Sequence, residues 1–209
     1  MTENQVMLSP SKITAWLECE HYLTLKINDE VQSKKQRSKK IATKHEPSSG
    51  LMTPPEDFAD MLRKKGDLHE HRCLERYKET YPSSVYEVPE RNETAYENFA
   101  EWVQRIGNPM EENYEVIFQM PFMHEGIRGV ADFLLRVEYG KGKVAYEPVD
   151  SKLSRTGAKQ GHLLQLLFYA EAIEAKTGIR PRQVHVLLGS GEVESFNVRD
   201  YWWYWKRLQ

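Results

Sequence analysis

The spacing of apolar residues changes near residue 113, and this change constrains the fold more than any other feature of the chain. Residues 56–80 and 92–106 carry apolar side chains at helical intervals, the pattern of amphipathic helices. Residues 114–122, 127–137 and 143–153 instead show the period of two that is typical of strands. This order predicts an α/β protein, in which helices pack against a sheet.

Short turns join the three strand candidates, at Gly126 and over residues 138–142, and therefore predict an antiparallel meander. A strongly apolar helix is expected over 160–176, followed by a β-branched strand over 183–188 and a shorter one over 193–198. We expect a mixed sheet, built from the meander and the strand that follows the crossover helix, with helices on its faces.

The length of 209 residues fits one domain, spanning 1–209. Residues 1–110 are expected to be mostly helical, and their first helix to run over 9–27, because serine and proline give a good helix start there. Residues 111–200 hold the predicted sheet and crossover helix. An aromatic C-terminal helix begins over residues 201–209.

A basic segment interrupts an otherwise acidic chain. Residues 31–50 hold five lysines and one arginine against a single glutamate, a local charge of +5, while the whole chain carries −2. The surrounding loop, 31–55, is rich in proline and serine near its end. Three interpretations stay open: a solvated loop, an arm that contacts phosphates, and a composition similar to a nuclear localisation signal.

The cysteine content and the N-terminus favour an intracellular protein. Cys19 and Cys73 are the two cysteines, and neither belongs to a CxxC pair. The first ten residues lack the layout of a signal peptide. The longest apolar run, over 163–169, is far shorter than the ~20 residues of a membrane span. We expect a cytoplasmic protein without a membrane segment.

Three charged residues on two predicted strands point to chemistry. Asp150 and Lys152 share one face of their strand, while Glu147 and Ser151 point to the other. The hairpin between the strands brings Asp132 beside Asp150. Two adjacent carboxylates repel unless a cation lies between them, and Mg²⁺ prefers such oxygen ligands. The alternative interpretation is a cross-strand salt bridge on a solvated face.

Three more side chains occur in a suggestive order along the chain. His69 lies on a helix ahead of the sheet, and a neutral histidine is a good metal ligand. Gln165 and Tyr169 share one face of the helix that follows the lysine. Each has an ordinary alternative: a lone helical histidine is more often structural, and the Gln–Tyr pair alone is common helix packing.

The order His, Asp, Asp-x-Lys, Gln-xxx-Tyr resembles the RecB-type branch of the PD-(D/E)XK nucleases, which includes the nucleases of CRISPR adaptation. The resemblance runs from Leu8 to Gly189 and implies a restriction-endonuclease-like core. It implies the following roles. The metal ligands would be His69, Asp132, Asp150 and the main-chain carbonyl of Ser151. The catalytic residues would be Asp132, Asp150 and Lys152. Gln165 and Tyr169 would support the site or touch the nucleic acid, and Gly129 would be the glycine ahead of the aspartate.

The chain departs from that family in three respects. Asp150 stands where many members have Glu, and two residues rather than three separate Gly66 from His69, so that His71 is an alternative ligand. Several relatives carry an iron–sulfur cluster, which needs four cysteines. No cysteine follows Cys73, so we expect no such cluster.

The resemblance implies a Mg²⁺- or Mn²⁺-dependent deoxyribonuclease that acts as an exonuclease on single-stranded DNA or DNA ends. The alternative is a catalytically silent module that binds DNA or serves as a scaffold in a repair or CRISPR adaptation complex. The five consecutive aromatic residues over 201–205 could stack on bases, but we favour their burial against a further module or a protein partner.

Overall fold

The computed structural model describes Ser9, Lys12 and the residues 56–154 and 157–209. Apart from Ser9 and Lys12, the helix expected over 9–27, together with Cys19 and the basic segment 31–50, lies outside the described residues. Within the described residues, no helix is both long and apolar enough to cross a membrane.

The described part of the chain forms a six-stranded mixed sheet in which the strands lie side by side in chain order. The strands are β1 (Val85–Glu87), β2 (Val116–His124), β3 (Ile127–Glu138), β4 (Val144–Lys152), β5 (Gln183–Leu188) and β6 (Val193–Asn197). β2, β3 and β4 form the predicted antiparallel meander. β5 runs parallel to β4, and β6 returns antiparallel to β5. The predicted α/β architecture, with its mixed sheet, is confirmed.

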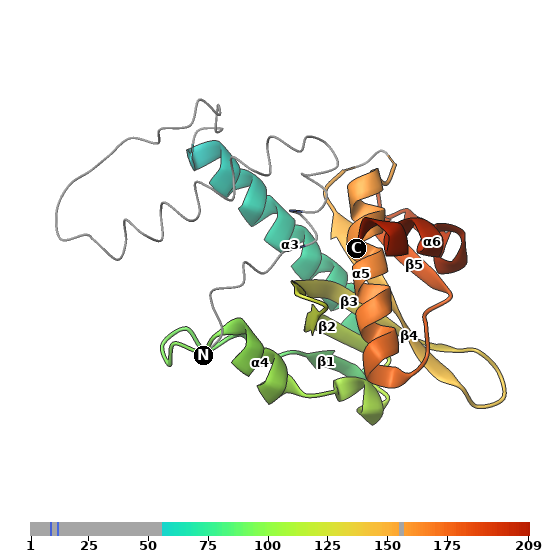
Figure 1. Ribbon diagram of the computed structural model, residues 1–209. Coiled ribbons are helices and arrows are strands. Elements are labelled where there is room, and N and C mark those ends of the chain that lie inside the picture. The colour runs from blue at the N-terminus through green and yellow to red at the C-terminus, as the bar shows by residue number, and fades with distance from the viewer. Residues whose placement is uncertain (1–8, 10–11, 13–55, 155–156) are drawn as a thin grey trace.

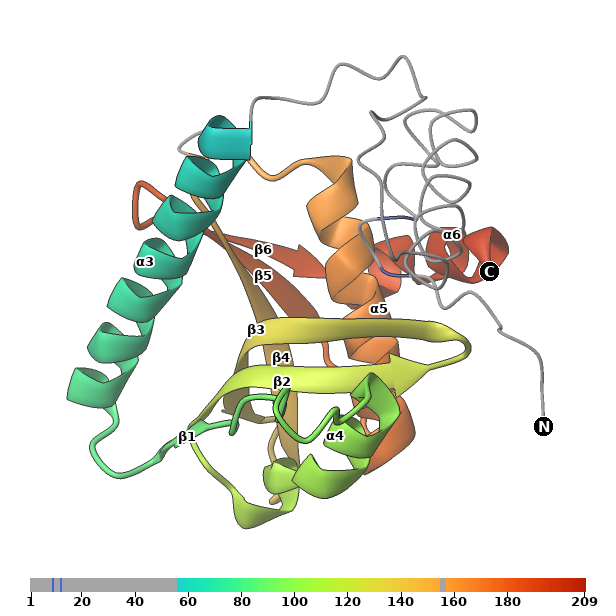
Figure 2. The same cartoon turned by 90° about the vertical axis from the view of Figure 1, so that its left-hand side faces the viewer.

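Helices cover both faces of the sheet. They are α3 (Glu56–Thr80), α4 (Phe99–Ile106), the 3₁₀ turn η1 (Pro109–Glu112), α5 (Gln160–Thr177) and α6 (Val198–Leu208). Cys73 and Leu74 of α3 pack in one apolar cluster with Phe133 and Val149. α5 packs in the other, larger cluster, and Figures 1 and 2 show α3 and α5 on opposite sides of the strands.

The crossover helix α5 forms the centre of the larger core, because it is apolar on nearly all sides. Its residues from Leu166 to Ala170 are all buried, as expected for a helix between a sheet and a second helix. The helix ends at Gly178, which adopts a left-handed conformation with φ 73° and donates its N–H to the carbonyl of Glu174. This is the usual glycine stop at a helix C-terminus.

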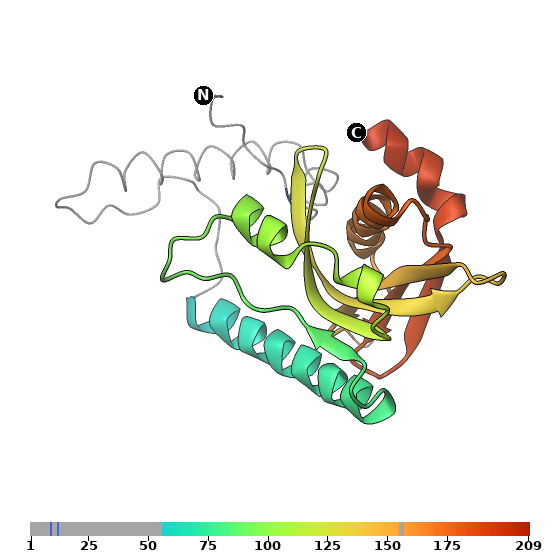
Figure 3. The same cartoon turned by 90° about the horizontal axis from the view of Figure 1, so that it is seen from below.

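The helix expected over 92–106 is shorter in the structure and covers Phe99–Ile106 only. Asn98 caps it: its side chain accepts from the N–H of Ala100 and Glu101, and Glu101 accepts from the N–H of Asn98. Ahead of it, Asn92 accepts from the N–H of Ala95 and folds a turn. Local side-chain hydrogen bonds of this kind compete with helix formation. Figure 3 shows the extended segment between β1 and α4.

The C-terminal helix α6 is attached to α5 through one buried carboxylate. Glu171 of α5 accepts hydrogen bonds from Trp205 Nε1 (2.8 Å), Lys206 Nζ (2.6 Å) and Gln209 Nε2 (2.5 Å). These bonds outweigh the effect of burial and lower the pKa of Glu171. The aromatic residues of α6 are therefore divided between an inner and an outer face.

We expect Trp205→Ala to lower the free energy of unfolding by about 3–5 kcal/mol, because it removes a buried indole from the core. The matched variant Trp203→Ala removes an exposed indole of the same helix and should change it by less than ~0.5 kcal/mol. Urea denaturation followed by circular dichroism measures both values. Equal losses would contradict the assignment of the two faces.

Candidate functional site

Asp150 and Lys152 lie on the same side of β4, as their spacing predicts. Lys152 Nζ donates to Asp150 Oδ1 at 2.8 Å, and Asp150 is 1% exposed. The other carboxylate oxygen, Oδ2, is buried and has no hydrogen-bond partner among the described residues. Buried polar atoms are nearly always paired, so this oxygen needs a partner such as a water molecule or a bound ion.

Asp132 of β3 lies beside this pair. The regular ladder between β3 and β4 reaches Phe133 opposite Val149, and Asp132 and Asp150 are the next residue on each strand. Asp132 Oδ2 accepts the backbone N–H of Ser151 at 2.7 Å. The hairpin therefore brings the two aspartates together, as the sequence predicts.

A second buried carboxylate of β4 shows what a structural site looks like in the same sheet. Glu147 accepts from Tyr139 Oη (2.6 Å), the N–H of Gln183 (3.0 Å) and His185 Nε2 (3.0 Å). These bonds outweigh the effect of burial and lower its pKa. Asp150 has the opposite behaviour, because burial and the charge of the neighbouring aspartate raise its pKa to about 7.

Glu70 of α3 is a site residue that the sequence reasoning did not assign. Its carboxylate accepts from Gln119 Nε2 of β2 at 2.7 Å. Burial and the charge of Asp132 raise the pKa of Glu70 to about 8, and the charge of Lys152 partly opposes the rise. Glu70 directly follows His69 in the sequence, but only the packing of α3 against the sheet shows that it belongs to the site.

The strand pair β2–β3 is distorted at the site. Gln119, which the register places opposite Asp132, has a left-handed φ of 59°. Phe118 and Phe133 pack in the cluster under α3, whereas Met120 and Ala131, two residues further along each strand, pack in the cluster under α5. In each strand, the set of side chains that faces α3 before this point therefore faces α5 after it. A left-handed non-glycine residue costs about 1–3 kcal/mol, and inside a strand, away from a turn, such strain is a feature of functional sites.

His69 lies within electrostatic range of Asp132 and is only partly buried. Burial, together with the charges of Arg76 and Arg72, lowers its pKa, so the imidazole is neutral at neutral pH. Its Nε2 lies 3.9 Å from the sulfur of Cys73 one turn further on. The alternative ligand, His71, hydrogen-bonds through Nδ1 to the carbonyl of Asp67 at 2.8 Å.

Three carboxyl groups lie within electrostatic range of the Lys152 ammonium group. Burial raises the pKa of Asp132, as it does those of Glu70 and Asp150. The two aspartates keep the pKa of Lys152 above its usual value, although burial opposes them. Among residues 56–154 and 157–209, no three His, Cys, Asp or Glu side chains stand in an arrangement that could hold a metal ion.

Gln165 and Tyr169 of α5 hold β3 rather than face the solvent. Tyr169 is 2% exposed and donates its hydroxyl to the carbonyl of Val130 at 2.6 Å. Gln165 Nε2 donates to the same hydroxyl at 3.2 Å. A Cβ at Gly129 would lie 2.9 Å from the hydroxyl of Tyr169, so only glycine permits this close approach. Of the two roles expected for this pair, the geometry favours support of the site.

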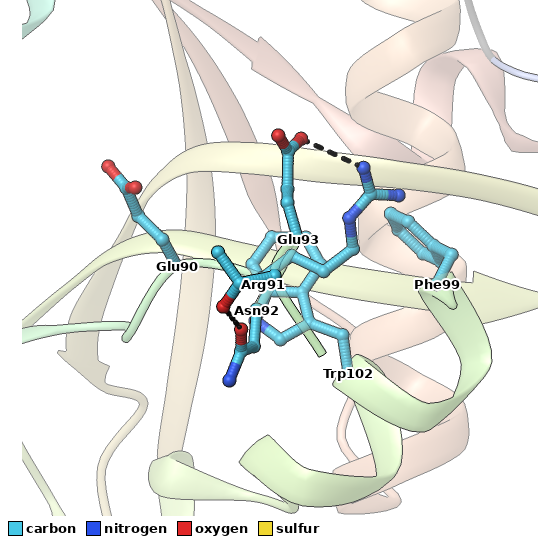
Figure 4. A pocket seen from close by; sticks show the side chains of 7 residues that line it. Glu90, Arg91, Asn92, Glu93, Phe99 and Trp102 are labelled. Atoms are coloured by element: carbon cyan, nitrogen blue, oxygen red, sulfur yellow. Dashed lines mark hydrogen bonds and ion pairs between the residues drawn. The ribbon is translucent and has the colours of Figure 1, made fainter. Parts of the chain in front are cut away.

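A cleft of about 720 Å³ opens beside Asp132. Residues of α3, of β2 and of the segment after β1 line it, among them Glu70, Gln119 and Glu90. A neighbouring hollow, drawn in Figure 4, lies between this segment and α4. There Arg91 pairs with Glu93 at 3.1 Å, and none of Asp132, Asp150 and Lys152 lines the hollow. The cleft at Asp132 is therefore the better candidate for a substrate.

Comparisons with protein-family models and with curated proteins find no match for this chain.

We expect Asp150→Asn to raise the melting temperature of the metal-free protein by several degrees at pH 8. A carboxyl group with a raised folded-state pKa ionises more easily when the chain unfolds. The wild-type protein therefore loses stability as the pH rises from 3.8, the ordinary pKa of an aspartate, through about 7, the pKa of Asp150 in the folded protein. The Asn variant has no carboxyl group to ionise and does not lose this stability. The difference should shrink toward zero near pH 4. Differential scanning fluorimetry measures it, with the exposed Glu125→Gln as control.

We expect Gly129→Ala to lower the free energy of unfolding by about 1–3 kcal/mol, because the new methyl group overlaps the Tyr169 hydroxyl. In a Tyr169→Phe background the same change should cost less. The control Gly66→Ala meets no atom within 4 Å and lies inside α3, so it should be neutral or stabilise by up to ~1 kcal/mol. Equal costs of Gly129→Ala in the two backgrounds, measured in urea, would argue against the contact.

Proposed function

We propose that this chain is a divalent-metal-dependent nuclease that hydrolyses DNA phosphodiester bonds. The observation that carries the proposal is the buried carboxylate of Asp150, which has one unpartnered oxygen beside Asp132 and Lys152. Such an arrangement is costly for folding alone and is typical of a site that binds a cation. The mixed sheet and its crossover helix are compatible with a restriction-endonuclease-like core, which belongs to the same proposal.

The carboxylate donors fit Mg²⁺ or Mn²⁺, because they are hard oxygen atoms and a bound cation would favour the ionised form of carboxyl groups whose pKa is raised in its absence. Asp132 and Asp150 would hold the ion. The family resemblance implies His69 and the Ser151 carbonyl as further ligands, but the described residues do not bring His69 and the two aspartates into a three-ligand arrangement. Glu70 is an additional carboxylate within electrostatic range. When bound, the ion would polarise the scissile phosphate and make water easier to deprotonate.

The other residues of the site would stabilise charge on the phosphate or hold neighbouring groups in position. Lys152 keeps its proton, because two aspartates surround it, and its ammonium can donate to a phosphate oxygen as negative charge develops there. The Tyr169 hydroxyl holds the backbone at Val130, two residues before Asp132. Gln119 restrains the carboxylate of Glu70. The substrates that we expect are single-stranded DNA and DNA ends, cut by exonuclease action.

A catalytically silent DNA-binding module is the second candidate. The observation that favours it is the ion pair between Lys152 and Asp150 at 2.8 Å, since this pair satisfies one of the oxygens that a metal ion would use. The two candidates differ in turnover and not in affinity. A protein that retains DNA with Mg²⁺ and Mn²⁺ supplied, and yields no cleavage product, would support the second.

We expect Asp150→Ala and Lys152→Ala each to lower the cleavage rate by at least about 100-fold, because the first removes a proposed metal ligand and the second removes the ammonium group that acts on the reacting phosphate. The assay compares 5′- and 3′-labelled single and double strands in Mg²⁺, Mn²⁺ and EDTA. The exposed Lys143→Ala is the matched control and should cleave normally. Undiminished cleavage by both site variants, with their fold confirmed by circular dichroism, would refute the assignment.

A further inference from the structure

The aromatic residues of α6 divide into two sets, and packing explains only one of them. Trp205 is buried against Glu171. Tyr201 contacts Phe196 of β6 with ring centroids 6.2 Å apart. Trp202 is covered by the Arg180 guanidinium, 3.8 Å from its ring centroid. These inward contacts attach α6 to β6 and to α5, and Figure 1 shows α6 beside α5.

The outer face of α6 carries an exposed indole between two arginines. Arg199, Trp203 and Arg207 follow one another at intervals of four residues, so they form one stripe along the helix. Trp203 is 80% exposed, and the side chain of Arg199 is 96% exposed. Tyr204, also exposed, borders the stripe. Arg207 forms no ion pair with any residue that the structure describes.

The spacing of charges along this stripe suits a nucleic acid. Trp and Arg are also frequent in protein interfaces, but an exposed indole with a guanidinium one turn before and one turn after it matches a base and its two flanking phosphates. The acidic residue nearby is Asp200, which lies 3.9 Å from Arg199 and accepts from Asn197 at 3.2 Å. The face is therefore aromatic and positively charged.

We propose that the Arg199–Trp203–Arg207 stripe is a stacking site for single-stranded nucleic acid, separate from the cleavage site. A base would stack on the indole of Trp203, and the guanidiniums one helical turn (about 6 Å) before and after it would contact the flanking phosphates. Stacking of this kind needs an unpaired base, so the site would favour single strands over duplexes.

The position of α6 connects this site to the candidate active site. α6 packs on α5 through Glu171, and α5 also carries Gln165 and Tyr169, which support β3 next to Asp132. A strand held on the outer face of α6 would lie on the α5 side of the sheet, and the cleft beside Asp132 is lined by α3 on the other side. The inference rests on the proposed function for the substrate, but the binding itself requires neither metal nor cleavage.

The test is fluorescence anisotropy of a labelled oligo(dT), with oligo(U) and a duplex for comparison, in EDTA and at several salt concentrations. Trp203→Ala should weaken binding of the single strand about tenfold, the equivalent of one stacked base. Trp203→Phe, which keeps an aromatic ring, should retain most of the affinity. Tyr96→Ala removes a 93% exposed aromatic residue ahead of α4 and should have no effect.

A second variant tests the charges independently of the indole. Arg207→Gln should lower the slope of log affinity against log salt by about 0.7, the value for one lost phosphate contact with a single strand. Unchanged affinity for Trp203→Ala would overturn the proposal. So would a Trp203→Ala variant that loses self-association in analytical ultracentrifugation but keeps its affinity for oligo(dT), because the face would then bind a second copy of the chain.

These outcomes separate the stacking site from the nuclease activity. A protein that binds oligo(dT) through Trp203 but shows no cleavage in Mg²⁺ or Mn²⁺ would refute the proposed function and support the stacking site. Metal-dependent cleavage together with full binding by Trp203→Ala would support the proposed function and refute the stacking site.

Discussion

The burial of Asp132 and Asp150 at adjacent positions of neighbouring strands is the constraint on which the candidate site depends. Removing two carboxylates from water is expensive, and one ammonium group, Lys152, offsets only part of the repulsion. Glu147, buried in the same sheet, shows that the fold can satisfy a carboxylate fully when its role is structural. The unpaired oxygen of Asp150 is therefore the strongest argument for a ligand.

The surrounding structure holds these groups in place from both faces of the sheet. On one face, α3 brings Glu70 to Gln119; on the other, α5 presses Tyr169 against the backbone at Val130. At the distortion around Gln119, the apolar side chains of β2 and β3 change from packing in the cluster under α3 to packing in the cluster under α5, at the level of Asp132. These contacts hold the charged groups in fixed positions, and charges positioned in this way can stabilise developing charge without reorganisation.

The sheet and the central site residues could be predicted because they follow from strand geometry. Alternation places Asp150 and Lys152 on one face of β4, and a tight hairpin returns β3 to the same level, so Asp132 arrives beside them. The helix over 92–106 was predicted too long, because Asn92 and Asn98 make local hydrogen bonds that periodicity does not reveal. β1, three residues long, has too little pattern to be recognised.

The sequence by itself thus determined the order of strands and helices and the pairing of the two aspartates, since these depend on periods of two and 3.6 residues along the chain. Only the tertiary structure decided that Glu70 joins the site, that Gln119 is left-handed, and that Tyr169 faces β3. It also decided which indole side chains of α6 are exposed to solvent. These features arise from contacts between segments that are distant in the sequence, and the spacing of residues along the chain does not predict which segments will pack together.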